Sequence, residues 1–420
     1  MRRIDTVIVG GGQAGLATSR CLAERGVDHV VLERGRIGER WRSERWDSLH
    51  LLTPNWMSRL PGHAYRGPDP DGFLHKDEVV ALLAGYARSF AAPVEEGTTV
   101  TSVAPDRGGD GWRVTTDRGG WRARNVVIAS GCCDRPRVPG MAAALDRRVA
   151  QVTPDRYRNP ADLPPGDVLV VGASATGVQL ADEIARSGRG VTLAVGEHNR
   201  LPRRYRGRDV VWWLDRLGVL DRPLDDMPDP RAARREPSLQ LVGRPAGEPA
   251  DLDLAVLAAR GVRLAGRLAA AAGRRVRFAG ELRATVAAAD ARMARVLERI
   301  DRSIAAHGLD DRFPATPRPE PVRLAGPGPA ELDLAARGIT TVLWATGYRR
   351  VYPWLHAPVL DAEGEIRQRR GRTPLPGLYT VGLQFMIRRR STFLDGVGRD
   401  ACEIADEIAG ARGAQLATAA

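Results

Sequence analysis

An α/β fold made of two Rossmann-like units is predicted from three features of this 420-residue sequence. The first is an apolar run, Asp5–Val9, that leads into a glycine-rich turn and then a helical pattern. The second is a repeat of the same order that begins at Asp167–Val171. The third is Gly377–Gly382, a strand-like segment near the C-terminus that suggests a return of the chain to the first unit. We therefore expect an α/β protein with a discontinuous first domain and helical insertions.

The first glycine turn has the spacing of a dinucleotide-binding fingerprint. Gly10 permits a tight turn, Gly12 lets the backbone approach a pyrophosphate, and Gly15 lets the helix pack closely on the strand. The next strand, His29–Leu32, ends at Glu33, whose carboxylate is placed to accept hydrogen bonds from ribose hydroxyls and would repel a 2′-phosphate. We expect cofactor contacts here from Gly10, Gly12, Gln13, Ala14, Gly15, Glu33 and Arg34.

The second turn follows the strand Asp167–Val171 and has a serine where the middle glycine would stand. Ser174 brings a small side chain toward the pyrophosphate, which suits a nicotinamide cofactor that binds and leaves rather than one held permanently. A strand over Val191–Val195 completes the unit. We expect cofactor contacts here from Gly172, Ser174, Ala175, Thr176 and Gly177. The sequence thus predicts two dinucleotide-binding domains.

Three arginines, Arg200, Arg203 and Arg204, follow the last strand of the second unit. Arginines at this place can hold a 2′-phosphate through charge-assisted hydrogen bonds, which favours NADPH over NADH. Glu197 argues against this interpretation, and a solvated loop in an arginine-rich protein would show the same pattern.

Two further apolar strands, Val126–Ile128 and Val342–Trp344, run into small residues. Small residues at strand ends let the backbone lie against a cofactor. The strand near the C-terminus also ends in a glycine. We expect cofactor contacts from Ser130, Gly131, Ala345, Thr346, Gly347 and Gly382.

Composition excludes several classes of function. The formal net charge of +12 comes almost entirely from arginine, since Lys76 is the only lysine, and the arginines alternate with acidic residues without a nucleic-acid recognition motif. No apolar stretch is long enough to span a bilayer, and strand-like sequence starts at Ile4, so we expect a cytoplasmic protein. The four cysteines form no CxxC pair and no metal-ligand spacing, so we expect no metal site and no standard dithiol.

With these motifs in hand, the sequence resembles the superfamily of flavin-containing and Baeyer–Villiger monooxygenases. The resemblance rests on both fingerprints, on Trp41, on the Ala345–Gly347 run and on the segments Trp46–Pro54 and Phe73–Val79. It covers most of the chain and implies FAD in the first unit, with Trp41 among its contacts, and NADPH in the second. The chain departs from the family at Thr153 and Pro154, where a histidine and a serine are usual.

The implied domains are an FAD domain over 1–158 and 322–420 and an NADPH domain with a helical insertion over 159–321. Asp209–Pro230 and Glu281–His307 exceed a minimal Rossmann unit, and the second of them is predicted as a long amphipathic helix. Two interpretations stay open for these segments: a helical face that only packs on the domain, or a lid over a substrate pocket.

The activity that the resemblance implies is oxygenation of a small organic substrate by O2 through a C4a-(hydro)peroxyflavin, as N- or S-oxygenation or Baeyer–Villiger oxidation. Thr53 and Asn55 are candidate catalytic residues for contacts with the peroxide, or alternatively part of a buried turn. The run Arg388–Arg390 could reach the flavin edge or an anionic substrate, or be a surface charge run.

Two other functions remain compatible with both fingerprints. One is an NADPH-dependent flavin dehydrogenase or reductase that inserts no oxygen, and the other is a redox-sensing flavoprotein with slow turnover. The expected partners are a small-molecule substrate and O2, without nucleic acid or an integral membrane segment, and a homodimer is compatible with the sequence.

Overall fold

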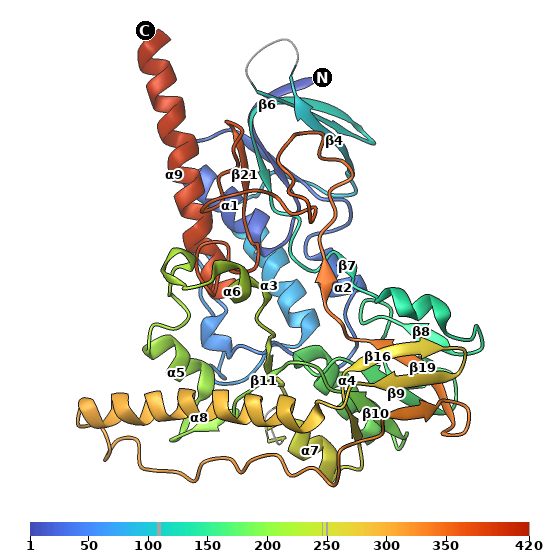
Figure 1. Ribbon diagram of the computed structural model, residues 1–420. Helices are drawn as coiled ribbons and strands as arrows, with labels where there is room; N and C mark the ends of the chain where they lie inside the picture. The colour runs from blue at the N-terminus through green and yellow to red at the C-terminus, as the bar shows by residue number, and fades with distance from the viewer. Residues whose placement is uncertain (107–110, 246, 249–250, 420) are drawn as a thin grey trace.

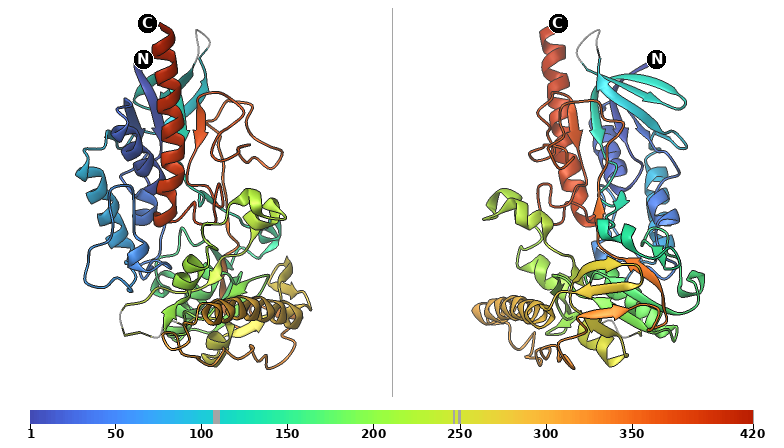
Figure 2. Two further views of the ribbon diagram at one scale, coloured as in Figure 1. Left: turned by 90° about the vertical axis from the view of Figure 1, so that its left-hand side faces the viewer. Right: turned by 45° about the vertical axis from the view of Figure 1, so that its right-hand side comes forward.

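The computed structural model describes residues 1–106, 111–245, 247–248 and 251–419. The chain forms two α/β parts stacked end to end, each around its own sheet (Figure 1 and Figure 2). Both termini lie at the outer end of the first part, and a long helix runs along the outer end of the second. The predicted fold class is confirmed.

The sheet of the first part has seven strands in the order β3-β2-β1-β6-β5-β4, with β21 pairing with β6. The strands β3, β2, β1 and β6 are parallel, and β5 and β4 continue the sheet as an antiparallel meander. Because β21 comes from the end of the chain and pairs parallel with β6, the first domain is discontinuous, as the sequence predicts. The strands are β1 Arg2–Val9, β2 His29–Leu32, β3 Val94–Glu95, β4 Val100–Pro105, β5 Trp112–Thr116, β6 Gly119–Ile128 and β21 Leu378–Thr380.

The helices of the first part share an apolar core with one face of this sheet. The first and last helices of the chain, α1 and α9, pack on each other beside β21 (Figure 1). Helix α3 begins at a capping box, in which the His75 side chain accepts from the Asp77 N–H and the Glu78 carboxylate accepts from the His75 N–H. These helices are α1 Gln13–Glu24, α2 Glu39–Ser43, α3 Lys76–Ser89 and α9 Leu394–Ala419.

The sheet of the second part has the parallel order β15-β10-β9-β19-β8. Its strands are β8 Ala150–Val152, β9 Asp167–Val171, β10 Val191–Ala194, β15 Arg263–Ala265 and β19 Ile339–Trp344. This pairing corrects the predicted domain boundaries, because β8 and β19 fall in the segments 1–158 and 322–420 that the sequence assigns to the first domain. Strand pairing is a long-range property, and the small residues after β19 mark a cofactor-facing strand end without showing to which sheet the strand belongs.

The helical insertion packs partly on the second part and partly on the first. Helices α5 (Val210–Arg216) and α8 (Leu282–Ala306) share an apolar core that also contains Met57 of the first part. The long helix predicted over Glu281–His307 is therefore confirmed. The remaining elements are η1 Asn55–Met57, β7 Arg135–Pro136, η2 Gly140–Ala144, η3 Pro160–Asp162, α4 Ala175–Arg186, β11 Asn199–Arg200, β12 Arg204–Tyr205, β13 Arg208–Asp209, η4 Leu224–Asp226, α6 Pro230–Arg235, β14 Leu239–Gln240, α7 Leu254–Ala259, β16 Leu268–Ala272, β17 Arg275–Phe278, β18 Glu331–Asp333 and β20 Tyr348–Arg349.

Among the described residues, no helix is long and apolar enough to cross a membrane. The same residues contain no group of three or more His, Cys, Asp or Glu side chains placed to hold a metal ion.

Candidate cofactor cradles and the cavity between them

The two glycine turns share one geometry. Gly10 and Gly172 have φ of 114° and 109°, a conformation that favours glycine, and a Cβ at either would collide with the carbonyl oxygen after the neighbouring strand. A Cβ at Gly15 or Gly177 would overlap the carbonyl oxygen of Gly10 or Gly172, respectively. Each helix therefore starts in direct backbone contact with the turn before it, which points its free N–H groups over the carboxyl end of the sheet.

The first cradle has room for a pyrophosphate. A Cβ built on Gly12 meets no described atom within 4 Å, in contrast to one on Gly15. Gly12 is also the N-cap of α1, and no side-chain hydrogen bond from the described residues caps this helix. At the end of β2, Glu33 accepts hydrogen bonds from the N–H groups of Gly11 at 2.6 Å and Gly35 at 2.9 Å, so its carboxylate is held beside the turn. These residues fit an adenine dinucleotide.

The other residues predicted for the first cradle lie at different distances from it. A Cβ built on Gly10 would lie 3.4 Å from the Cα of Ser130. A Cβ built on Gly382 would lie 2.6 Å from the Cβ of Ala14. Gln13 and Trp41 line the cavity described below. Arg34 is largely exposed and pairs with Glu44 at 3.2 Å.

The second cradle repeats this arrangement at the start of α4. Ser174 is the N-cap of this helix, and its hydroxyl makes no capping hydrogen bond to a described residue, so it is free to contact a ligand. After β19, Thr346 donates a hydrogen bond to the carbonyl of Arg137, and Gly347 has φ of 85° with no described atom within 4 Å of a built Cβ. Ser174, Thr176 and the run 345–347 all line the same cavity.

Two of the three arginines predicted to bind a 2′-phosphate have other partners. Arg200 and Arg203 are only 3% and 2% exposed. Arg200 pairs with Asp290 at 3.0 Å, and Arg203 pairs with Asp209 at 2.7 Å. The structure therefore contradicts the phosphate role of Arg200 and Arg203, because both guanidinium groups are buried and already paired with aspartates. Arg204 is exposed and donates to the carbonyl of Gly207 at 3.1 Å.

Arg267, which the sequence pattern did not indicate, is better placed to contact a 2′-phosphate than Arg200 or Arg203. It follows β15, the strand beside β10, and it lines the cavity together with Gly196 and Glu197 at the end of β10. Its Cγ and Cδ would lie 3.9 Å from a Cβ on Gly196, and its exposed guanidinium pairs with Glu281 at 2.9 Å. No local motif marks this residue, because only strand pairing brings β15 next to β10.

The second cradle and Gln13, which follows Gly12 of the first cradle, line one cavity of about 2340 Å³ between the two parts. Beyond the cradles, its wall is mixed: apolar side chains of the helical insertion and of the loop before α9 line it together with charged residues such as Arg137, Arg234, Arg350 and Glu365. The apolar lining includes Leu52, Leu201, Val211, Leu214, Leu217, Val219, Leu220, Val296, Leu383, Phe385 and Phe393. The insertion thus lines the cavity as well as packing on the domain.

The two candidate catalytic residues differ in position. Thr53 lines the cavity, whereas Asn55 is 5% exposed and donates its amide to the carbonyl of Asp69 at 2.9 Å. Asn55 therefore has the structural role in a buried turn that the sequence left open. Arg203 supports this segment from the second part, since it donates to the carbonyl of Leu52 at 2.8 Å and its guanidinium carbon lies 4.1 Å from the centre of the Phe73 ring.

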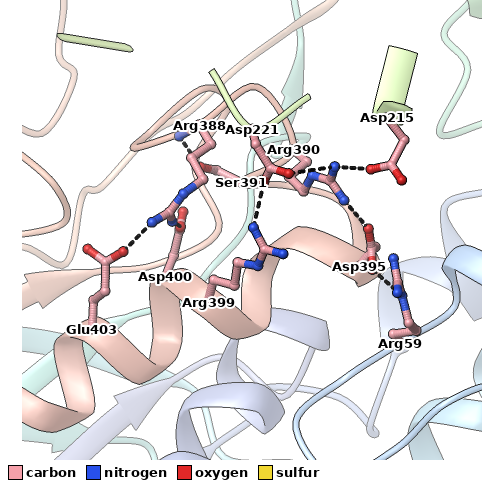
Figure 3. A network of polar contacts seen from close by, with 10 residues as sticks. All are labelled: Arg59, Asp215, Asp221, Arg388, Arg390, Ser391, Asp395, Arg399, Asp400 and Glu403. Carbon is pink, nitrogen blue, oxygen red and sulfur yellow. Dashed lines mark hydrogen bonds and ion pairs between the residues drawn. The ribbon is translucent and has the colours of Figure 1, made fainter. Parts of the chain in front are cut away.

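An ionic network joins the insertion to the first part (Figure 3). At its centre is Arg390, 2% exposed, which pairs with Asp215 of α5, with Asp221 at 3.0 Å and with Asp395 of α9. Arg390 is therefore surrounded by carboxylates from both parts of the molecule. Of the predicted run Arg388–Arg390, Arg390 is structural, whereas Arg389 lines the cavity and pairs with Glu236 at 2.6 Å.

The same network continues along α9. Arg388 pairs with Asp400 at 2.7 Å and with Glu403 at 2.5 Å (Figure 3). Burial raises the pKa of Asp400 to about 6, against the opposing effects of a hydrogen bond from Ser391 and the charge of Arg388. The loop before α9 is thus fixed at both ends, to its own helix and to the insertion.

The sheets, the cradles and the shared cavity define the class of oxidoreductases that use a flavin and a pyridine nucleotide. The model of the family "Pyridine nucleotide-disulphide oxidoreductase" matches residues 7–214. Over 409 residues the chain is 30% identical to "Uncharacterized oxidoreductase CzcO-like" of Geobacillus kaustophilus, covering 96% of this chain and 98% of that protein. The chain therefore belongs to the family of CzcO-like oxidoreductases.

The resemblance to flavoprotein monooxygenases is also confirmed. The chain is 34% identical over 210 residues to the indole-3-pyruvate monooxygenase YUCCA6 of Arabidopsis thaliana, covering 48% of this chain and 50% of that protein. Its fold matches that of a flavin-containing monooxygenase from Stenotrophomonas maltophilia with a TM-score of 0.65 at 21% identity, covering 98% of this chain and 99% of the other.

Two glycines of the first turn should separate cofactor binding from folding. We expect Gly12→Val to fold and lose its flavin, because the added side chain fills the space of the pyrophosphate. Gly15→Ala should instead lower the free energy of unfolding by about 1–3 kcal/mol, because its methyl group collides with the backbone. The absorbance ratio at 450 and 280 nm measures flavin, and circular dichroism in urea measures stability. A Gly12→Val protein that keeps its full flavin content would contradict the assignment of the first glycine turn as the flavin-binding site.

The buried arginine of the ionic network should matter more than its exposed neighbour. We expect Arg390→Met to lower the free energy of unfolding by about 3 kcal/mol, because it leaves three carboxylates without their shared cation. Arg399→Ala is the matched control, since Arg399 pairs with Asp221 from a side chain that is 60% exposed, and it should cost less than about 1 kcal/mol. Equal urea midpoints for the two variants would refute this ranking.

Proposed function

We propose that this protein is an FAD- and NADPH-dependent monooxygenase that transfers one atom of O2 to a small organic substrate. The observation that carries the proposal is the single cavity lined by the second cradle, by Gln13 at the first cradle and by a group of apolar side chains. Bound FAD supplies hydride acceptance from NADPH and activation of O2. The balanced reaction consumes substrate, NADPH, a proton and O2 and yields oxygenated substrate, NADP⁺ and water.

The assignment of FAD to the first cradle rests on Gly12 and Glu33. The open space at Gly12 accepts a pyrophosphate, and the Glu33 carboxylate disfavours a second phosphate on the adenosine ribose. The run after β6, Ser130 and Gly131, and the glycine after β21, Gly382, would complete the backbone contacts on this side.

The assignment of NADPH to the second cradle rests on Ser174 and Arg267. The uncapped N-terminus of α4 is suited to the pyrophosphate of a cofactor that exchanges with solvent. Arg267 would pair with a 2′-phosphate at the carboxyl end of β10, in exchange for its present partner Glu281. Glu197 lies at the same edge and its charge disfavours the phosphate. The balance between Glu197 and Arg267 therefore sets the preference for NADPH over NADH.

The chain's own contribution to oxygen transfer is an apolar section of the cavity wall. Val211 and Leu214 of α5, Val296 of α8 and Phe385 and Phe393 of the loop before α9 form it and keep water away from the reacting atoms. The hydroxyl of Thr53 is a hydrogen-bond donor on the same wall, for oxygen or for the substrate.

A reductase that inserts no oxygen is the second candidate, and one observation favours it. Cys132 and Cys133 line the cavity just after β6, with their sulfur atoms 3.8 Å apart. Electrons from the flavin could then leave by reduction of a small acceptor instead of O2. Labelled oxygen distinguishes this function from oxygen transfer.

Labelled oxygen tests the proposed function directly. With NADPH and ¹⁸O2, we expect one ¹⁸O atom in the product from at least one member of a panel of amines, sulfides, ketones and indole-3-pyruvate, the substrate in the printed name of the YUCCA relatives. Unlabelled O2 in H2¹⁸O is the control and should give unlabelled product, apart from exchange at carbonyl oxygens. If each substrate instead leaves all consumed O2 as hydrogen peroxide, the reductase function replaces this one.

Substitution at the end of β15 tests the nicotinamide assignment. We expect Arg267→Ala to lower the ratio of kcat/KM for NADPH over NADH by about 10- to 150-fold, the equivalent of one charge-assisted contact of about 1.5–3 kcal/mol. Arg263→Ala is the matched control, because Arg263 is an exposed arginine at the other end of the same strand. An unchanged ratio in Arg267→Ala would place the selectivity elsewhere.

A further inference from the structure

Two cysteines distant in sequence meet between the first and last helices of the chain. Cys21 lies on α1 and Cys402 on α9, and their sulfur atoms are 2.7 Å apart. This separation is closer than two non-bonded sulfur atoms normally approach, and it needs only a small side-chain movement to reach the disulfide bond length of about 2.05 Å. Both helices belong to the FAD domain and run side by side (Figure 1).

The two thiols have different surroundings. Cys21 is 0% exposed, whereas Cys402 is partly exposed. Arg25 lies beside the pair, donating to the carbonyl of Cys21 at 2.8 Å and to Asp406 of α9 at 2.8 Å. A hydrogen bond from the Cys21 thiol and the charge of Arg25 lower the pKa of Cys402 to about 7, and hydrogen bonding to Cys402 and burial raise the pKa of Cys21.

We propose that Cys402 and Cys21 form a peroxide-responsive pair that closes to a disulfide and links α1 to α9. The accessible Cys402 thiolate attacks one oxygen of hydrogen peroxide, breaks the O–O bond and becomes a sulfenic acid, releasing water once a proton is taken up. The buried Cys21 thiol then attacks that sulfur, forms the S–S bond and expels the second water. The sum is two thiols and one H2O2 to one disulfide and two waters.

The position of this link gives it a consequence for the cofactor. The helix α1 carries the first nucleotide cradle at its N-terminus, and α9 begins at the ionic network that holds the insertion. A covalent bond between these helices closes nearly the whole chain into one loop, which restricts the unfolded state. The oxidised protein should therefore unfold at a higher temperature and release its flavin more slowly than the reduced protein. This inference does not depend on the monooxygenase function.

The link is tested on the full-length protein with hydrogen peroxide as the only oxidant. After treatment, free thiols are blocked with N-ethylmaleimide, and tryptic peptides are mapped with and without dithiothreitol. We expect the loss of two titratable thiols and a cross-linked peptide pair containing Cys21 and Cys402, both reversed by dithiothreitol. Irreversible oxidation of Cys402 without the link, a link confined to Cys132 and Cys133, or no loss of thiols would each overturn the proposal.

Cysteine variants test whether the Cys21–Cys402 disulfide causes the predicted rise in Tm. Wild-type protein should show a higher Tm after peroxide, whereas Cys402→Ser should show no rise. The double variant Cys132→Ser/Cys133→Ser is the matched control and should still show the wild-type rise, because it keeps the α1–α9 pair. Since Cys402 is partly exposed, Cys402→Ser should fold, and Cys21→Ala provides the second test. A Tm rise that persists in Cys402→Ser would assign the stabilisation to another site and refute the link.

Discussion

The first turn of α1 starts against the backbone of the turn that ends β1, and α4 starts in the same way after β9. Gly15 and Gly177 leave no room for a side chain at these contacts. This close backbone approach points the free N–H groups of each helix at the edge of its sheet, where a pyrophosphate can replace the missing hydrogen-bond partners. The Glu33 carboxylate and the Ser174 hydroxyl add polar groups to the backbone conformation that the glycines allow. The rest of the molecule brings these two edges to one cavity.

The cavity depends on contacts that cross between the two parts. Arg203 of the second part holds the Leu52 carbonyl of the first, next to Thr53. Arg390 of the first part holds two carboxylates of the insertion, Asp215 and Asp221. Because these guanidinium groups are buried, removing one partner would leave a buried polar or charged group unpaired, which costs more than the loss of a surface ion pair. The apolar wall from α5 and α8 is therefore held over the cradles by charge as well as by packing.

Four arginines of this chain have a structural role that its composition does not reveal. Arg200, Arg203, Arg206 and Arg390 are buried, and each pairs with at least one aspartate. Planar guanidinium groups suit such sites, because they bind carboxylates through several donors and stay charged when buried. These four guanidinium groups are therefore internal structural partners and add nothing to a positive surface patch.

The sequence by itself determined the two cradles, because a nucleotide fingerprint is local. The strands His29–Leu32 and Asp167–Val171 have the predicted bounds, and both glycine turns have the predicted close contacts. Tertiary structure alone decided the sheet of β8 and β19, the burial of Arg200 and Arg203, the turn role of Asn55 and the place of Arg267 beside β10. A strand's apolar pattern shows that it is buried without showing its neighbour. An arginine's function depends on which carboxylate or ligand lies within a few ångströms, and segments far apart in the chain bring that partner.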